Sequence, residues 1–370
     1  MPGARTLLGT TLCCLVCACG GGGGGGSGGP PPPATPALLF ITNGSAGTID
    51  VLRIDTATGA PAPASGSPFG DGPAPQAAAV DPQLRYLYVA SSTGEVRGYQ
   101  LDSSTGSLSA LSGSPFATGG DSVAIAVDPN GQFVLTANGT TNTVSVFRIG
   151  SSGALAEVSG SPFAAGNDPD AIVVAPGNYV YAGNAGDGTI SAYTMDTSSG
   201  ALTPVAGSPF AADGDPLSLV LNPEGTRVYA ADANPSAVSA LQINSGSGAL
   251  SPIPGSPFSA PNGALSVVMD GAGALLHVAN GTNVDCYQVD SGSGVLSWLG
   301  TSVTHGKASA LAVDAADNFL YALDNVDNQV EAFSIHSVDY NLSLINGNPY
   351  PLFQGSAGQA LGPTSITIVH

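Results

Sequence analysis

The sequence is short of charge, and above all of positive charge. Charged residues make up 9% of the 370 residues, and 26 acidic side chains stand against seven basic ones, giving a formal net charge of −19. Lys307 is the single lysine. A surface with this balance repels the phosphates of nucleic acids and of anionic lipids. We therefore expect no nucleic-acid partner and no direct binding to an anionic membrane surface.

Cysteine is scarce outside the N-terminus, where four of the five lie in the segment TLCCLVCACG. The apolar run from Thr6 to Val16 follows Arg5 and is too short to span a bilayer, which is typical of a signal peptide over residues 1–18. Val16-Cys17-Ala18-Cys19 resembles a bacterial lipobox, so we predict lipidation at Cys19. The alternative is ordinary cleavage and release of a secreted or periplasmic protein. Cleavage before Cys19 would leave Cys286 as the only other cysteine and exclude an internal disulfide.

The segment after Cys19 has nothing to bury. Gly20 to Pro33 reads GGGGGGGSGGPPPP. Glycine there provides a flexible tether and proline a stiffer spacer. We interpret residues 19–36 as a lipidated tether and residues 37–370 as the folded domain. An outer-membrane or cell-surface lipoprotein is the predicted location, with the lipid as its only membrane contact.

The rest of the chain is a repeat. Gly-Ser-Pro-Phe begins at Gly66, Gly113, Gly160, Gly207 and Gly255, a spacing of 47 or 48 residues, and degenerate copies begin at Gly300 and Gly347. Seven units of short alternating segments with turn residues between them predict an all-β, seven-bladed β-propeller of four-stranded antiparallel blades. We expect proline of the repeat at the outer edge of a blade and phenylalanine wedged between adjacent blades.

The two ends of the domain complement each other. The first unit has segments matching a second strand at Leu38–Asn43 and a third at Thr48–Ile54, and it lacks a first strand. Pro363–His370 reads as a first strand without a blade. We predict that the two ends pair in one blade and close the ring. Trp298 of the sixth unit is expected to pack between blades, and His277 and Cys286 to be packed strand residues.

Blades such as YLYVASSTGEVRGYQLD and FVLTANGTTNTVSVFRI, with the turn DPNGQF and the Gly-Ser-Pro-Phe ends, resemble the Tyr-Val-Thr-Asn-type repeats of the seven-bladed lactonase family. This family includes the propeller-type 6-phosphogluconolactonases. The resemblance implies Pro-Arg-His at the start of one first strand. Here the matching positions carry neither Arg nor His: Pro75-Gln76-Ala77, Pro169-Asp170-Ala171, Pro216-Leu217-Ser218 and Pro363-Thr364-Ser365.

Carboxylates gather in two sets of loops that we expect at the channel mouth. One set provides candidate ligands for Ca²⁺, a cation that takes six to eight oxygens, or for a cationic ligand: Asp121, Asp168, Asp170, Asp213 and Asp215. The other set adds further mouth carboxylates: Asp187, Asp232, Asp324 and Asp327. The alternative is a solvated acidic rim that uses aspartate for its turns.

His305 and Lys307 are the only His and Lys expected at the mouth, where His305 could act as a general base and Lys307 as an anion anchor. The alternative is a plain loop residue and an ion pair. Two functions remain open. One is a tethered binding or scaffold module, most simply a monomer, that takes an envelope protein or a small ligand at the channel mouth and has lost the family's catalytic residues. The other is a lactone hydrolase or cycloisomerase of the 6-phosphogluconolactonase type.

Overall fold

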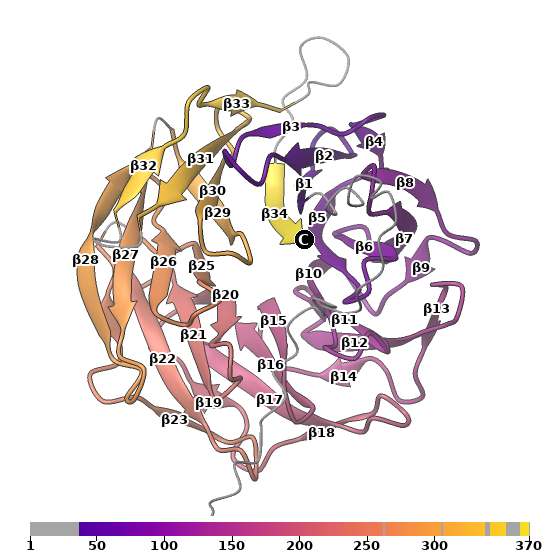
Figure 1. Cartoon of the computed structure of the whole chain (residues 1–370). Coiled ribbons are helices and arrows are strands. Elements are labelled where there is room, and N and C mark those ends of the chain that lie inside the picture. The colour runs from indigo at the N-terminus through magenta and orange to yellow at the C-terminus, as the bar shows by residue number, and fades with distance from the viewer. Residues whose placement is uncertain (1–36, 262, 305, 337–340, 353–362, 370) are drawn as a thin grey trace, which may run out of the picture. The chain divides into compact units, whose positions relative to one another are not determined.

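The computed structural model describes residues 37–261, 263–304, 306–336, 341–352 and 363–369. The chain divides into two units, Met1–Ala34 and Thr35–His370, and all described residues belong to the second. Within that unit, antiparallel strands form seven sheets around a central channel (Figure 1). The elements among the described residues are all β-strands. The predicted seven-bladed propeller is therefore confirmed.

Each blade runs outward from the channel through strands that we call a, b, c and d. Where five strands are given for a blade, the last two are the two pieces of strand d. The strands of the first four blades, in that order, are β34 (Pro363–Val369), β1 (Ala37–Asn43), β2 (Thr48–Ile54), β3 (Pro61–Pro63) and β4 (Phe69–Gly70); β5 (Pro75–Val80), β6 (Tyr86–Ser91), β7 (Glu95–Asp102), β8 (Ser107–Ala110) and β9 (Phe116–Ala117); β10 (Ser122–Val127), β11 (Phe133–Asn138), β12 (Thr143–Ile149), β13 (Leu155–Glu157) and β14 (Phe163–Ala164); and β15 (Pro169–Ala175), β16 (Tyr179–Asn184), β17 (Thr189–Met195), β18 (Leu202–Pro204) and β19 (Phe210–Ala211).

The remaining three blades follow the same order. They are β20 (Pro216–Leu221), β21 (Arg227–Asp232), β22 (Ala237–Ile243), β23 (Leu250–Pro252) and β24 (Phe258–Ser259); β25 (Ser266–Met269), β26 (Leu275–Ala279), β27 (Asn283–Val289) and β28 (Leu296–Val303); and β29 (Ala308–Val313), β30 (Phe319–Asp324), β31 (Gln329–Ile335), β32 (Leu342–Leu344) and β33 (Tyr350–Pro351). Strand d is thus split into two pieces in six blades and is continuous, as β28, in the sixth.

The Gly-Ser-Pro-Phe turn makes this interruption. In the third blade, Gly160 has a φ of 90°, a left-handed conformation that favours glycine. Ser161 then places its Oγ 3.0 Å from the backbone N–H of Val146 on strand c and accepts its hydrogen bond. Serine therefore provides the acceptor that the interrupted strand cannot. The same bond recurs at Ser67, Ser114, Ser208 and Ser256, and at Asn348 in the seventh blade.

Phenylalanine of the repeat lies between blades, as predicted. Phe163 is half-buried and packs against a core cluster that joins strands of the third blade, such as β11 with Leu135, to strands of the fourth, such as β16 with Val180. Burial of such a ring contributes about 1.5–3 kcal/mol when it is complete. Each repeat therefore helps to bind its blade to the next.

The sixth blade departs from this pattern. Its degenerate Gly300-Thr301-Ser302-Val303 continues strand β28, which pairs with β27 along its length apart from one register shift opposite Cys286 and Tyr287. Trp298 on this outer strand is 59% exposed, so the expectation that it packs between blades is wrong. Without the turn, the strand stays at the outer edge and presents Trp298 to solvent.

A buried tyrosine on strand b clamps four blades to the next one. Tyr88, Tyr181, Tyr229 and Tyr321 are fully buried, and each hydroxyl donates to a glycine carbonyl in the c–d turn of the following blade. The last of these bonds runs from Tyr321 in the seventh blade to Gly59 in the first, at 2.9 Å. The blades are therefore joined by polar as well as apolar contacts.

The ring closes as the sequence predicts. Strand β34 pairs antiparallel with β1, where Ile41 faces Ile366 and Leu39 faces Ile368. Thr367 of β34 also donates through Oγ1 to the carbonyl of Ala78 in the second blade, at 2.9 Å. The C-terminal strand thus completes the first blade and contacts its neighbour.

Candidate functional site

The d–a loops and the b–c loops lie on one face of the propeller, which we call the mouth. Backbone hydrogen bonds join them directly: Asp71 N–H donates to the carbonyl of Gly47 at 2.8 Å, and Ala185 N–H to the carbonyl of Asp168 at 2.8 Å. The expectation that both loop sets share a face is confirmed. Side chains from different blades can therefore meet there.

A channel of about 290 Å³ opens at the centre of the ring. All seven strands a contribute to its lining, because each pairs with a strand b on one edge only and turns its other edge to the axis. The positions that match Pro-Arg-His of the family lie there, among them Gln76, Asp170, Leu217 and Thr364. Asp170 is the one charged residue among the described residues of this lining.

Asp170 lies where β15 begins, and burial is the main cause that raises the pKa of its carboxyl to about 6. The nearby carboxylates Asp168 and Asp121 raise it further, because like charges disfavour ionisation. Asp121 and Asp168 themselves are tied into loop structure. Asp121 Oδ1 accepts from Thr140 N–H at 2.7 Å, and Asp168 takes a φ of 54° while its own N–H donates to Asn142 Oδ1.

Two of the predicted mouth carboxylates are buried parts of the scaffold. Asp232 ends strand β21, where its Oδ2 accepts from the N–H of Ser239 at 3.0 Å and from its hydroxyl at 2.6 Å. Burial raises the pKa of Asp232 to about 6. Asp324 ends β30 and accepts from the N–H groups of Val326 and Asp327 and from Gln329 Nε2. Both are at most 1% exposed and face their own blade.

The other predicted carboxylates lie on the surface of the mouth or close to it. Asp187 is exposed, and its Oδ2 accepts from the N–H of Asn167 at 2.6 Å. Asp213 and Asp327 are exposed and Asp215 is half-buried. Among the described residues, no group of three or more His, Cys, Asp or Glu is placed to hold a metal ion. The Ca²⁺ hypothesis stays a prediction, and this arrangement gives it no support.

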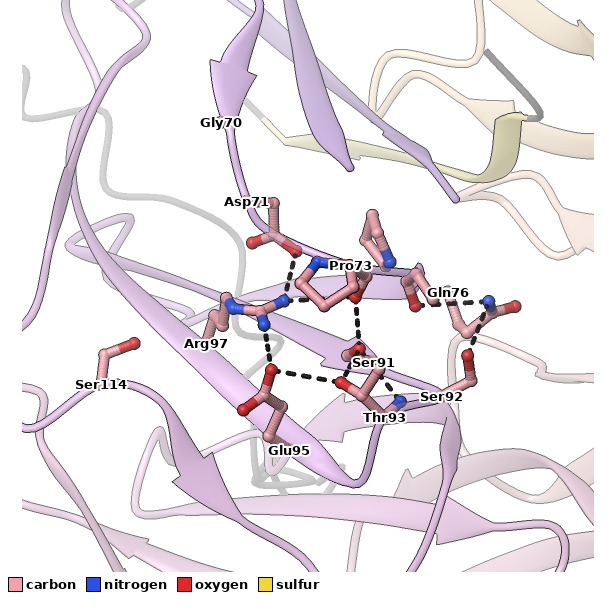
Figure 2. A network of polar contacts seen from close by, with 12 residues as sticks. Gly70, Asp71, Pro73, Gln76, Ser91, Ser92, Thr93, Glu95, Arg97 and Ser114 are labelled. Atoms are coloured by element: carbon pink, nitrogen blue, oxygen red, sulfur yellow. Dashed lines mark hydrogen bonds and ion pairs between the residues drawn. The ribbon is translucent and has the colours of Figure 1, made fainter. Parts of the chain in front are cut away.

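Sequence reasoning did not identify Arg97, which the structure places at the mouth. Its guanidinium lies between two carboxylates: Nη1 is 3.3 Å from Asp71 Oδ2, and Nη2 contacts Glu95 Oε1 (Figure 2). Tyr99 donates to the other Asp71 oxygen at 2.6 Å. The Arg97 side chain is 11% exposed, and two carboxylates balance its charge. It is therefore poorly placed to bind an anionic ligand.

Lys307 is exposed in the last described d–a loop, and His305 lies outside the described residues. The structure therefore does not test either of their proposed roles. The backbone around them is close to the mouth, since the N–H of Gly306 donates to Glu331 Oε1 at 3.1 Å.

His277 and Cys286 are packed strand residues, as predicted. Both are buried, and His277 Nδ1 lies 3.2 Å from Cys286 Sγ. Burial lowers the pKa of His277 to about 4 and raises that of Cys286 to about 12. Both groups are therefore neutral near pH 7, so they do not form the ion pair that activates a nucleophilic thiolate.

Three predictions concern residues that the structure does not describe, namely the signal peptide over residues 1–18, lipidation at Cys19 and the tether over residues 19–36. The structure leaves all three as predictions. Among the described residues, no helix is long and apolar enough to cross a membrane.

Several solved structures share this fold across nearly their full length. A protein of Bacteroides uniformis provisionally named a 6-phosphogluconolactonase is 20% identical, with a TM-score of 0.78 over 90% of this chain and 100% of its own. A protein of Bacteroides fragilis with the same provisional name is 18% identical, with a TM-score of 0.80 over 92% and 100%. The periplasmic gluconolactonase PpgL of Pseudomonas aeruginosa is 18% identical, with a TM-score of 0.77 over 90% and 99%. At these identities the likeness establishes the fold.

No curated protein sequence matches this chain. The family model described as "Lactonase, 7-bladed beta-propeller" matches residues 39–171 and 158–269, which together are more than half of the chain. With the closed ring of seven blades, this match shows that the chain belongs to the seven-bladed β-propeller lactonase family.

Proposed function

We propose that this lactonase-family propeller binds a small, hydroxyl-bearing ligand in its central channel and does not hydrolyse lactones. The observation that carries this proposal is the channel lining, where the described residues include no Arg, Lys or His. A phosphorylated sugar needs a cation, and stabilisation of a developing oxyanion by a positively charged side chain needs one as well. The one described charged residue of the lining, Asp170, is unsuited to either task.

The channel suits a small polar ligand for two reasons. Its volume of about 290 Å³ is close to the lower limit of ordinary ligand pockets. No further described strand pairs with the inner edges of the strands a. Some of their backbone groups bond to side chains of the neighbouring blade, as the Val267 N–H does to Ser218 Oγ and the Ala78 carbonyl to Thr367 Oγ1, and the other N–H and C=O groups on these edges can bind hydroxyls in either direction. The hydroxyls of Ser218, Ser309 and Thr364 are hydrogen-bonded within the protein and make the channel wall polar between its apolar side chains.

The test measures hydrolysis and binding together. Glucono-δ-lactone and its 6-phosphate are incubated with the protein, and acid release is followed in a pH-stat. Glucose and glucosamine are titrated by calorimetry. The proposal predicts no hydrolysis above the uncatalysed rate and measurable heat with at least one sugar. Turnover of either lactone, or no binding of any sugar, would contradict it.

A second candidate is hydrolysis of an uncharged lactone, and Asp170 favours it. A carboxyl whose pKa is raised to about 6 is suited to act as a general base on water. Loss of lactone turnover in Asp170→Asn, together with unchanged turnover in His305→Ala and Lys307→Ala, would support this candidate.

We also propose that the protein is exported and attached to the outer membrane or the cell surface through a lipid on Cys19, with an envelope protein as an alternative occupant of the mouth. The lipobox-like Val16-Cys17-Ala18-Cys19 and the Gly/Pro segment after it support this. Metabolic labelling with a fatty acid, comparing the wild type with Cys19→Ala, tests the attachment. An unlabelled wild type in the soluble fraction would contradict it.

A further inference from the structure

Asp170 differs from every other polar side chain in the channel lining. The others all hydrogen-bond within the protein: Ser218 Oγ accepts from Val267 N–H, Ser266 Oγ accepts from Leu311 N–H, and the same is true, with other partners, of Gln76, Ser309, Thr364 and Ser365. No hydrogen bond lowers the pKa of Asp170, and no described side chain or backbone group bonds to its carboxylate. Its oxygens are therefore available to a ligand.

Among the described residues, no cation compensates the charge of Asp170. The charged groups that act on it are Asp168 and Asp121, both acidic. At the mouth, Arg97 is engaged by two carboxylates in the second blade. A partly buried carboxylate among like charges favours any ligand that brings a positive charge, and the channel restricts that ligand to a small one.

Resting on the channel-binding function proposed above, we propose that the channel selects hydroxyl-bearing ligands that carry a protonated amine, with the Asp170 carboxylate as the counter-ion of that amine. An ammonium group has three donors and no acceptor, so it complements the carboxylate oxygens. The hydroxyls of the same ligand bind the inner strand edges. Amino sugars and amino-polyols are the class of ligand that joins both groups at this size.

The same arrangement disfavours anions. A sugar phosphate entering the channel would meet Asp170, with Asp168 and Asp121 close to it and no free cation among the described lining residues. Selection therefore has an attractive and a repulsive side, the combination from which specificity usually arises.

The experiment titrates the full-length protein by calorimetry near pH 7 with glucosamine, glucose and glucosamine 6-phosphate. A charge-assisted hydrogen bond predicts that glucosamine binds about tenfold more tightly than glucose, or more. The phosphate should bind more weakly than either. Asp170→Asn should bring glucosamine and glucose to equal affinity, while Glu157→Gln, which removes one charge from the exposed outer strand β13, should keep the difference.

The outcomes separate this inference from the channel-binding function. If glucose and glucosamine bind the wild type equally, or if Asp170→Asn keeps the preference, the inference is overturned and the binding function stands. If neither sugar binds, the binding function itself fails. Circular dichroism of Asp170→Asn confirms that the variant is folded, and Asp170→Glu should retain a preference for glucosamine.

Discussion

A hydrogen bond joins the last blade to the first, and a substitution that removes a single oxygen atom abolishes it. Tyr321 on β30 is fully buried, and its hydroxyl donates to the carbonyl of Gly59 at 2.9 Å. Tyr321→Phe keeps the aromatic ring of the side chain and leaves the buried carbonyl of Gly59 without its hydrogen-bond partner. Removing one partner of a buried hydrogen bond costs about 1–3 kcal/mol, so the free energy of unfolding should fall by that amount.

Tyr88→Phe provides the matched control, because it removes the same bond between the second and third blades, where Tyr88 donates to Gly153 at 2.8 Å. We expect both variants to fold, since Leu135 occupies the corresponding position of the third blade without a hydroxyl. In a closed ring that unfolds as one unit, both substitutions should lower the free energy of unfolding by similar amounts.

Urea unfolding followed by far-ultraviolet circular dichroism measures the loss of unfolding free energy in both variants. The two losses can be compared if the free energy of unfolding falls with urea concentration at the same slope in each variant. A Tyr321→Phe variant as stable as the wild type, beside a destabilised Tyr88→Phe, would refute the reasoning. It would mean that the seventh blade does not dock on the first as the structure shows, and that the ring is open in solution.

Three further predictions concern the scaffold. Deleting Thr364–His370 removes most of β34, the inner strand of the first blade, and should abolish cooperative thermal unfolding; an unchanged melting transition would contradict ring closure. Ser161→Ala leaves the Val146 N–H without an acceptor and should cost about 1–3 kcal/mol in urea unfolding, whereas Ser161→Asn should recover much of the loss, because Asn348 performs this role in the seventh blade. The pKa of Asp232 in the folded state is about 6, above its ordinary value, so its buried charge destabilises the wild type above pH 6, and this penalty fades as the pH falls toward 4. Asp232→Asn should therefore unfold at higher urea than the wild type at pH 7.5 and lose that advantage at pH 4; a constant difference between the two pH values would contradict the assignment.

The fold could be predicted from the sequence because seven repeat units carry the same pattern of strands and turns. A period of 47 or 48 residues with turn residues between alternating segments fits few architectures, and the missing strand a of the first unit indicates closure. The error at Trp298 has the same origin. The prediction assumed that every blade ends alike, whereas the sixth has lost the proline turn and keeps a continuous outer strand, β28.

The site was less predictable, because its properties depend on distances between strands. Asp71 and Arg97 lie 26 residues apart, and nothing local to either indicates their ion pair. The sequence groups Asp232 with Asp170 as mouth carboxylates, yet one faces its own blade and the other lines the channel. The role of Ser161 as an acceptor depends equally on where strand c passes the turn.

In a propeller, a residue that most blades share contributes to what every blade does, which is to fold and to contact its neighbours. Gly-Ser-Pro-Phe and the clamping tyrosines belong to that class. A ligand at the axis contacts all blades at once, so its orientation must come from positions where the blades differ. The second residue of strand a is such a position, since it carries Gln76, Val123, Leu217 or Thr364 in other blades and a charge only at Asp170. The charge asymmetry of the channel thus depends on one carboxylate, and substitutions there should change ligand choice while the repeat keeps the propeller intact.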